Sequence, residues 1–490
     1  MDMERTWKYL LYAFVGLLPL QTVYLLREVF IGGEKWQYGT IAVYVSDSIL
    51  FSVLILFFIS GDYAGKIFDF RYWIFDLKSR IKNLKSESVL PIALILWAGL
   101  SILWAPDQML AGYFVMKLAL AVGVFLMVRS LDEKESRIAV LLVVIGAVLE
   151  GALGVWQFLA QSTFASTLLG MSAHEAGQAG TSVLKLGDGR WLRAYGTLPH
   201  PNMLGGFLAA ALVLGIGYLT RFGKDSLCTV LMSRAELRES GASLWDRFID
   251  TVRMSGITLA GAMLLLGLLL TFSRSAWLGA ALGITVLATY FFFQSKSAKS
   301  ESNIIPRPSD YVTFYKTIFV LVAVGIAFVG VLRTQIFPRF DSAVIAAEGS
   351  VSERVQSLWD AERVIGEGNI LIGTGVGNFT AEMMRLQPDR PVWSIQPAHN
   401  VFVLIFAELG LVGFVLFIGF LAPVILSAVK NPEIPRQARN DKGYRVMSIA
   451  ALGALLPSLL LDHWLWTSHF GLLLLSMLLG IAARKYGNLA

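Results

Sequence analysis

Charged and ring-nitrogen side chains gather around the stretch from Val351 to Gly413. Arg354 follows Ser350-Val-Ser-Glu353, and the pair His399-Asn400 stands directly before a long apolar run. A neutral imidazole accepts a proton near pH 7, so His399 can serve as general base toward a hydroxyl nucleophile. The alternative is an interfacial histidine with a satisfied hydrogen bond. We therefore look for the function just outside the membrane span that follows His399.

The residues around Arg354 predict a helix. Ser350-x-x-Glu353 is a capping-box pattern, and Gly366 and Gly368 mark the expected end of the helix. Arg354 then lies in the first turn, where backbone N–H groups and the positive end of the helix dipole point the same way as its guanidinium, which favours anion binding. The alternative is an ordinary surface ion pair, for example with Asp360.

A second arginine stands where the chain leaves a long apolar stretch. Thr271-Phe-Ser-Arg274-Ser-Ala-Trp277 interrupts nearly forty apolar residues and leaves Arg274 at the mouth of two short spans. An arginine near membrane depth is costly and generally has an anionic partner, which predicts a functional site. A turn whose arginine reaches back to the interface is the alternative.

Further residues at similar positions compete for the same roles. His200, in the segment Arg193-Ala-Tyr-Gly-Thr-Leu-Pro-His-Pro-Asn202, and His463 occupy comparable mouths, whereas His174 in a glycine-rich loop is the least committed histidine. The glycines of Ile372-Gly-Thr-Gly-Val-Gly-Asn378 resemble a phosphate-binding loop only weakly, because their spacing differs from G-x-G-x-x-G and no Lys-Ser/Thr follows.

The composition indicates which kind of fold holds these side chains in place. The 490 residues are 56% hydrophobic and 16% charged, with a mean hydropathy of +0.63, which is typical of a polytopic membrane protein. We expect one all-α membrane domain over residues 1–490. The net charge of +6 sits mostly in short loops, so it does not indicate a nucleic-acid partner. The single cysteine, Cys228, excludes an internal disulfide and a thiolate metal cage.

Apolar runs long enough to cross the bilayer predict about twelve transmembrane helices. The first run has no cleavage pattern and is expected to be a retained span. The runs lie near residues 9–26, 39–60, 89–105, 110–128, 138–160, 201–219, 256–272, 276–293, 316–333, 400–428, 445–461 and 468–484.

Alternate loops carry most of the lysines and arginines, and by the positive-inside rule these loops and both termini are cytoplasmic. The remaining loops then face the other side, and two of them are long, at residues 161–200 and 334–399. The cytoplasmic loop at 220–255 mixes basic and apolar residues, which is compatible with an amphipathic helix on anionic lipid or with a solvated connector.

The motifs together resemble a known family. His399-Asn400, nine residues, Gly410, two residues and Gly413 resemble the H-[N/S/Q]-x9-G-x-x-G signature of the O-antigen ligase family, which includes O-antigen polymerases and protein O-oligosaccharyltransferases. The turn around Arg274, the helix and glycine segment from Arg354 to Phe379, and the segment from Arg193 to Asn202 are similar to segments of that family in the same order. The sequence departs from the family at Ile370, where members often have proline, and in its long basic loops.

The resemblance implies a membrane glycosyltransferase of the GT-C type with a large periplasmic loop between helices 9 and 10. It would act in the bacterial inner membrane, taking a glycan from undecaprenyl diphosphate for transfer to a lipid-anchored or glycan acceptor. Arg274 and Arg354 would bind the diphosphate and His399 would activate the acceptor hydroxyl, with Arg193, His200, Asn400 and His463 as possible additional residues. No cofactor and no metal are expected, because the outer loops contain no Asp-x-Asp pattern.

Two other functions stay open at this point. A polymerase would join lipid-linked repeat units to one another, and acceptor choice depends on cavity shape, which the sequence does not describe. A transporter or flippase of lipid-linked sugars would use Arg274 and Lys117 to line a route, since charges within spans also mark substrate pathways. A transporter has no need of His399, so this residue discriminates between the two classes.

Overall fold

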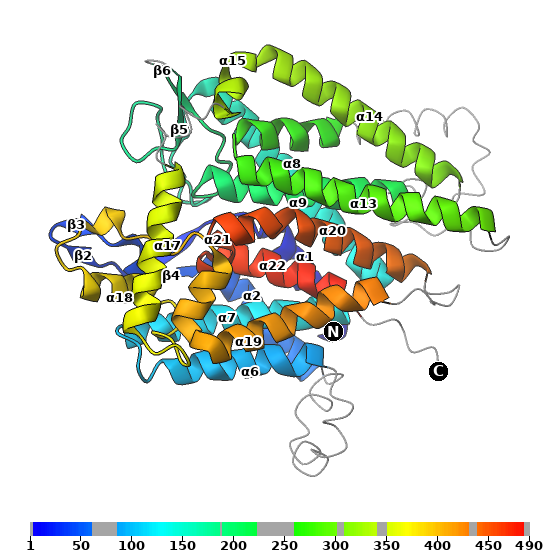
Figure 1. The fold of residues 1–490 in the computed structure, drawn as a ribbon. Helices are drawn as coiled ribbons and strands as arrows, with labels where there is room; N and C mark the ends of the chain where they lie inside the picture. Colours follow the sequence, from blue (N-terminus) through cyan, green and yellow to red (C-terminus); the bar gives the residue numbers. More distant parts are fainter. Residues whose placement is uncertain are drawn as a thin grey trace, which may run out of the picture.

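The chain folds into a mostly helical, multi-pass membrane protein (Figure 1). The computed structural model describes residues 3–60, 86–186, 189–222, 259–300, 308–340, 350–430 and 439–484. Within these residues, six helices are long and apolar enough to cross a membrane, and five shorter apolar helices accompany them. Most of the basic loop expected at 220–255 lies outside the described residues.

Eleven of the twelve expected apolar runs coincide with one of these helices. The long ones are in α7 (Gln108–Ser130), α8 (Glu133–Ala160), α9 (Pro201–Phe222), α13 (Arg274–Ser300), α14 (Pro308–Val331) and α19 (Val401–Lys430). The shorter ones are in α2 (Val45–Ile59), α6 (Ser86–Ser101), the helix over Leu259–Leu270, α20 (Arg439–Leu461) and α22 (His469–Ala482).

The first expected run, residues 9–26, is not a single span. Helix α1 (Met3–Leu17) ends two residues before Pro19, and the chain then forms strand β1 (Val23–Arg27). Proline has no N–H to continue a helix, and the residues that follow it are extended. Strand β1 pairs antiparallel with β4 (Ile41–Tyr44), so the beginning of the second expected run is also a strand.

The expectation of an all-α fold therefore needs correction, because three two-stranded sheets occur among the described residues. Besides β1 with β4, β2 (Phe30–Ile31) pairs with β3 (Glu34–Lys35) and β5 (Val183–Leu186) pairs with β6 (Gly189–Leu192). Strands of two to five residues are too short to give a clear period-2 pattern. All three sheets lie at the left end of the molecule in Figure 1.

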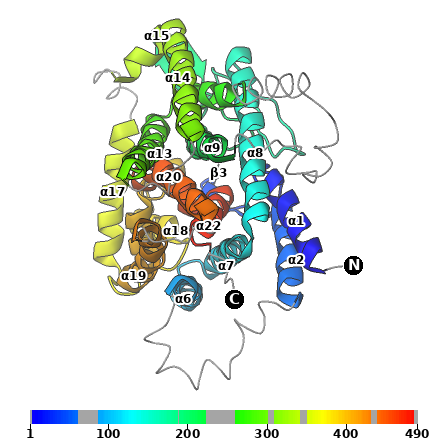
Figure 2. The ribbon, with the colours of Figure 1, turned by 90° about the vertical axis from the view of Figure 1, so that its right-hand side faces the viewer.

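The apolar helices run side by side and pack through small residues. Figure 2 looks along several of them, with α20 and α22 between α13 and α7. Helix α13 approaches α20 so closely that a Cβ on Gly279 would lie 2.0 Å from the carbonyl oxygen of Ala454. Such contacts are typical of helices in a membrane, where close backbone packing replaces the hydrophobic effect as the driving force.

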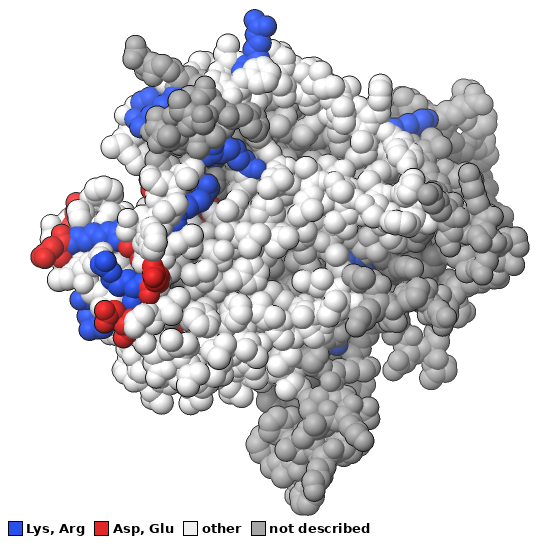
Figure 3. Space-filling model, in the orientation of Figure 1, with Lys and Arg blue, Asp and Glu red and all other residues white. Residues whose placement is uncertain are grey.

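At the left end, shorter elements cross the ends of this bundle. Helix α17 (Ser350–Glu367) runs crosswise to the spanning helices in both views, with α18 (Phe379–Leu386) beside it. The short helices α15 (Arg333–Ile336) and α21 (Trp464–Thr467) and the 3-10 turns η1 (Gln37–Gly39), η2 (Phe337–Phe340) and η3 (Val392–Ser394) complete this end. In Figure 3, the aspartates and glutamates visible on this face lie at this end, whereas the broad helical face is mostly white, with only scattered Lys or Arg.

Candidate functional site

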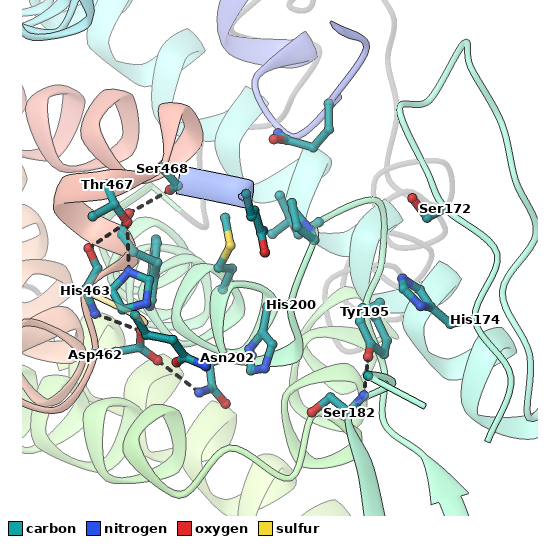
Figure 4. A pocket seen from close by; sticks show the side chains of 18 of the residues that line it. Ser172, His174, Ser182, Tyr195, His200, Asn202, Asp462, His463, Thr467 and Ser468 are labelled. Atoms are coloured by element: carbon teal, nitrogen blue, oxygen red, sulfur yellow. Dashed lines mark hydrogen bonds between the residues drawn. The ribbon is translucent and has the colours of Figure 1, made fainter. Parts of the chain in front are cut away.

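A cavity of about 1180 Å³ lies at the end of the bundle where the strands and α17 meet the spanning helices. Six of the seven predicted site residues line this cavity, although they come from five separate stretches of sequence; the exception is Asn400. The six are Arg193, His200, Arg274, Arg354, His399 and His463. Figure 4 shows part of the cavity, with Asp462 and His463 on one side of His200 and Tyr195 and His174 on the other.

A break in α19 anchors the loop that carries the site. Gly410 has φ 65° and ψ −169°, a conformation essentially restricted to glycine, and the helix is interrupted there. The carbonyl of Ala407 accepts a hydrogen bond from the N–H of Thr374, at 3.0 Å, and that of Glu408 accepts one from Gly375, at 2.8 Å. The glycine segment thus satisfies carbonyls that the broken helix leaves unpaired, which explains why Gly410 and these glycines occur together.

His399 is held against α17 by its backbone. Its N–H donates to Ser357 Oγ at 3.1 Å, and this hydroxyl donates to the carbonyl of Arg354 at 2.9 Å. The His399 ring meets the His463 ring edge to face, with 5.1 Å between centroids. The Nδ1 atom of His399 is buried and has no hydrogen-bond partner in the described part of the chain. The alternative of an interfacial histidine with satisfied ring nitrogens is therefore not observed.

The two predicted arginines face the same cavity. Arg354 donates from Nε to the carbonyl of Leu461 at 3.1 Å. Burial is the main cause that lowers the pKa of Arg354, and the nearby positive charge of Arg274 lowers this pKa further. The suggested pair of Arg354 with Asp360 does not form, because Arg390 binds both carboxylate oxygens of Asp360 at 2.8 Å. Two guanidiniums that lie close together favour a multiply charged anion between them.

Asp462 is a site residue that the sequence analysis did not single out. Its side chain is 7% exposed, and its two oxygens accept hydrogen bonds from His463 N at 2.8 Å and from Asn202 Nδ2 at 2.9 Å (Figure 4). Burial favours the neutral acid, but the neighbouring imidazoles, led by His463 and His399, and the bond from Asn202 outweigh it, so the pKa of Asp462 lies below its usual value. An ionised carboxylate therefore stands beside the histidines.

Burial also shifts the histidines toward their neutral form. It lowers the pKa of His463 to about 4, and it lowers that of His399, with the negative charge of Asp462 opposing the shift. The His200 ring is surrounded by protein yet open to the cavity, and its pKa is lowered first by burial and then by Arg193. Neutral imidazoles at pH 7 can accept protons, as a general base requires.

Arg193 connects parts of the site instead of pointing freely into it. It donates from Nε to the carbonyl of Thr271 at 2.7 Å, from Nη1 to Ser182 Oγ at 2.9 Å and from Nη2 to Asn202 Oδ1 at 2.9 Å. The first bond holds the turn before Arg274, and the third continues through Asn202 to Asp462. This geometry suits a positioning residue better than a substrate ligand.

Asn400 caps the helix that His399 precedes. Its Oδ1 accepts from the N–H groups of Phe402, at 3.0 Å, and Val403, at 3.1 Å, and its Nδ2 donates to the carbonyl of Leu460 at 3.1 Å. These bonds satisfy the free donors at the start of α19 and tie it to the end of α20. The side chain therefore sets the direction in which the chain leaves His399.

The chain is similar to a known protein family over part of its length. Residues 259–418 match the family model described as O-antigen ligase. Residues 259–418 are thus similar to an O-antigen ligase domain. No curated protein matches the sequence. The matched segment contains Arg274, Arg354 and His399, whereas Arg193, His200, Asp462 and His463 lie outside it and reach the same cavity only through the fold. The match implies glycan transfer in the membrane with lipid-linked glycans as substrates.

Proposed function

We propose that this protein transfers a glycan from undecaprenyl diphosphate to a hydroxyl of an acceptor, as an O-antigen ligase-like, inverting glycosyltransferase. One observation carries the proposal: Arg274, Arg354 and His399, which all lie within the matched domain, line one cavity at the end of the spanning helices. The cavity thus combines positive charge for a departing diphosphate with a base for an incoming hydroxyl.

The arginines act on the leaving group. As the bond from the anomeric carbon to the diphosphate oxygen breaks, negative charge grows on that oxygen, and two nearby guanidiniums stabilise it. Because they supply fixed positive charge, the reaction does not require a divalent metal ion or another cofactor. Attack from the side opposite the diphosphate inverts the anomeric centre.

His399 acts on the nucleophile. The acceptor hydroxyl oxygen forms the new bond to the anomeric carbon while its proton passes to the neutral imidazole of His399. Asp462 stabilises the imidazolium that results, because its carboxylate is ionised and lies near the ring. His463 and His200 border the same space, and Asp462 and Asn202 hold them in place.

The site faces the periplasm in this proposal, and the termini face the cytoplasm of a bacterial cell. The support is the position of basic residues at the other end of the bundle. Helix α7 begins beside Asp107, near the cavity end, and its last turn carries Arg129, which donates to the carbonyl of Ala483 at 3.2 Å. At that far end Lys8 pairs with Glu135 at 2.8 Å. By the positive-inside rule this end is cytoplasmic, and the 161–200 and 334–399 segments are periplasmic.

The test is transfer by the purified protein, in lipid nanodiscs, from an undecaprenyl-diphosphate-linked glycan to a lipid-anchored core oligosaccharide. We expect His399→Ala to reduce kcat about 10²- to 10⁴-fold, the usual contribution of a general base, and external imidazole to restore part of the rate. Wild-type protein that forms no glycosidic product, or His399→Ala protein that keeps full transfer, would refute the proposal.

Two changes to this experiment separate the remaining functions. Without core oligosaccharide, a polymerase would still lengthen the lipid-linked glycan, whereas a ligase would not. In sealed vesicles, a transporter would move lipid-linked sugar across the bilayer regardless of His399. Lys117, the other charge considered for a transport route, lines the cavity but donates to the carbonyl of Thr467 at 2.9 Å and lies over the Phe114 ring at 4.7 Å. We favour the ligase because it is the activity that names the matched domain.

A further inference from the structure

The cavity has a second lobe that the proposed chemistry does not use. Figure 4 shows Asp462, His463 and Thr467 on one side of His200, and Ser172, His174, Ser182 and Tyr195 on the other. We call this other part the His174 lobe; its lining includes Ser172, His174, Ser182, Lys185, Arg190 and Tyr195. A glycan donor and an acceptor must both reach His399, so a cavity with two lobes has room for separate binding sites.

His174 offers unoccupied polar atoms to this lobe. Its ring stacks on Tyr195, with 4.6 Å between centroids and 18° between planes, and Tyr195 is fixed by the bond that its Oη accepts from Ser182 N. The hydrogen bonds between His174 and Thr163 involve only the backbone N–H and carbonyl of His174. Its ring nitrogens have no hydrogen-bond partner in the described part of the chain. A fixed imidazole with a free donor and a free acceptor suits the hydroxyls of a sugar.

The hairpin at the rim of the lobe holds two basic residues against each other. Lys185 of β5 is directly opposite Arg190 of β6 in the antiparallel register, so both side chains stand on the same face. Both also line the cavity. Arg190 donates to the carbonyls of Ala176 and Gln178, at 2.6 and 3.3 Å, whereas no hydrogen bond or ion pair of Lys185 occurs with the described residues. Like charges directly opposite are destabilising unless an anion lies between them.

The described residues that line this lobe carry an excess of positive charge. Between 161 and 198, those that line the cavity include Lys185, Arg190 and Arg193, and no aspartate or glutamate is among these described lining residues. Arg193 is occupied by its three protein bonds, which leaves the Lys185–Arg190 pair as the positive charge that a ligand can reach.

We propose that the His174 lobe binds the acceptor, and that this acceptor is an acidic saccharide whose phosphate or carboxylate group lies between Lys185 and Arg190. His174 contacts hydroxyls of the same sugar. The identification of this ligand as the acceptor rests on the proposed function, in which the donor diphosphate occupies the Arg274 and Arg354 side of the cavity. Binding of an acidic sugar as such does not depend on it.

The kinetic test compares Lys185→Gln and His174→Phe with wild type. The phenylalanine keeps the stack on Tyr195 and removes both nitrogens. Lys35→Gln is the matched control, since Lys35 lines the cavity from β3 but is paired with Glu28. With lipid-anchored core oligosaccharide as acceptor, we expect both lobe variants to raise the KM for acceptor about tenfold and to leave the KM for donor within twofold of wild type. Treating the acceptor with phosphatase should remove the effect of Lys185→Gln but not that of His174→Phe.

A binding measurement keeps the inference separate from the proposed function. Saturation-transfer NMR with glucose 1-phosphate and with glucose needs no turnover, so it applies to wild type, Lys185→Gln and the His399→Ala protein alike. We expect the sugar phosphate to bind wild type and His399→Ala equally and Lys185→Gln at least fivefold more weakly. Equal binding of glucose and glucose 1-phosphate, or an equal rise in the KM for donor and acceptor, would overturn the assignment. Wild-type protein that binds the sugar phosphate but transfers nothing would instead refute the proposed function alone.

Discussion

Replacing Asp462 by asparagine tests whether a buried charge controls the histidines. The side chain keeps its shape but loses its charge, and one of its two acceptor oxygens becomes an NH₂ donor. In the structure both oxygens face N–H groups, those of His463 and Asn202. An amide can accept through only one atom, so one of these buried donors loses its partner, which costs about 1–3 kcal/mol of folding stability.

The effect on pH dependence has a definite sign. The base must be neutral to act, so the rate falls as the pH drops below the pKa of His399. The negative charge of Asp462 raises that pKa, while burial lowers it. Removing the charge therefore moves the acid limb of the kcat/KM profile to lower pH. A nearby opposite charge shifts a pKa by about one unit or more, and one unit corresponds to about 1.4 kcal/mol of stabilisation of the charged form. In Asp462→Asn the imidazolium of His399 loses this stabilisation. We therefore expect kcat at pH 7 to fall at least about tenfold.

The assay is the rate of glycan transfer from pH 4.5 to 8 for wild type, Asp462→Asn and Glu353→Gln. Glu353 is a matched control because it also lines the cavity, but it is exposed and has a smaller influence on His399. Its variant should keep both the rate and the position of the limb. An acid limb that stays in place or moves to higher pH in Asp462→Asn would refute the reasoning, even if the rate falls.

Two further predictions concern the loop anchor and the metal. Gly410→Ala would place a Cβ 2.4 Å from the backbone of Leu371 at a φ of 65°, so we expect about 1–3 kcal/mol of strain and a loss of transfer, measured by thermal unfolding and turnover. Gly453→Ala, whose Cβ would lie 3.9 Å from Val286, is the control that should behave as wild type. Transfer should survive complete chelation of divalent ions with EDTA, because Arg274 and Arg354 supply the positive charge; strict dependence on Mg²⁺ or Mn²⁺ would contradict this.

Local features of the sequence determined most of the helices of this protein and the residue types of its candidate site. Long apolar runs have few stable conformations in a membrane other than helices, and eleven of the twelve runs are helices in the structure. The helix that carries Arg354 is described from Ser350 onward and ends at Glu367, before Gly368, one of the two glycines expected to stop it. The residue types of Arg274 and His399, and their positions beside apolar runs, were sufficient to place them at the ends of spans.

Only the tertiary structure decided which of these residues meet. Asp462 follows an apolar helix, as many polar residues do, so its position in the sequence does not single it out. Its role comes from the hydrogen bond with Asn202 and the charge interaction with His399, two residues from distant parts of the chain. Arg193 has the residue type of a ligand, yet three bonds to protein make it a connector. The opposition of Lys185 and Arg190 depends on the strand register, which short hairpins do not reveal in sequence. Hydrogen bonds and charge contacts act over a few ångströms in space, so sequence patterns predict the elements but not the contacts between them.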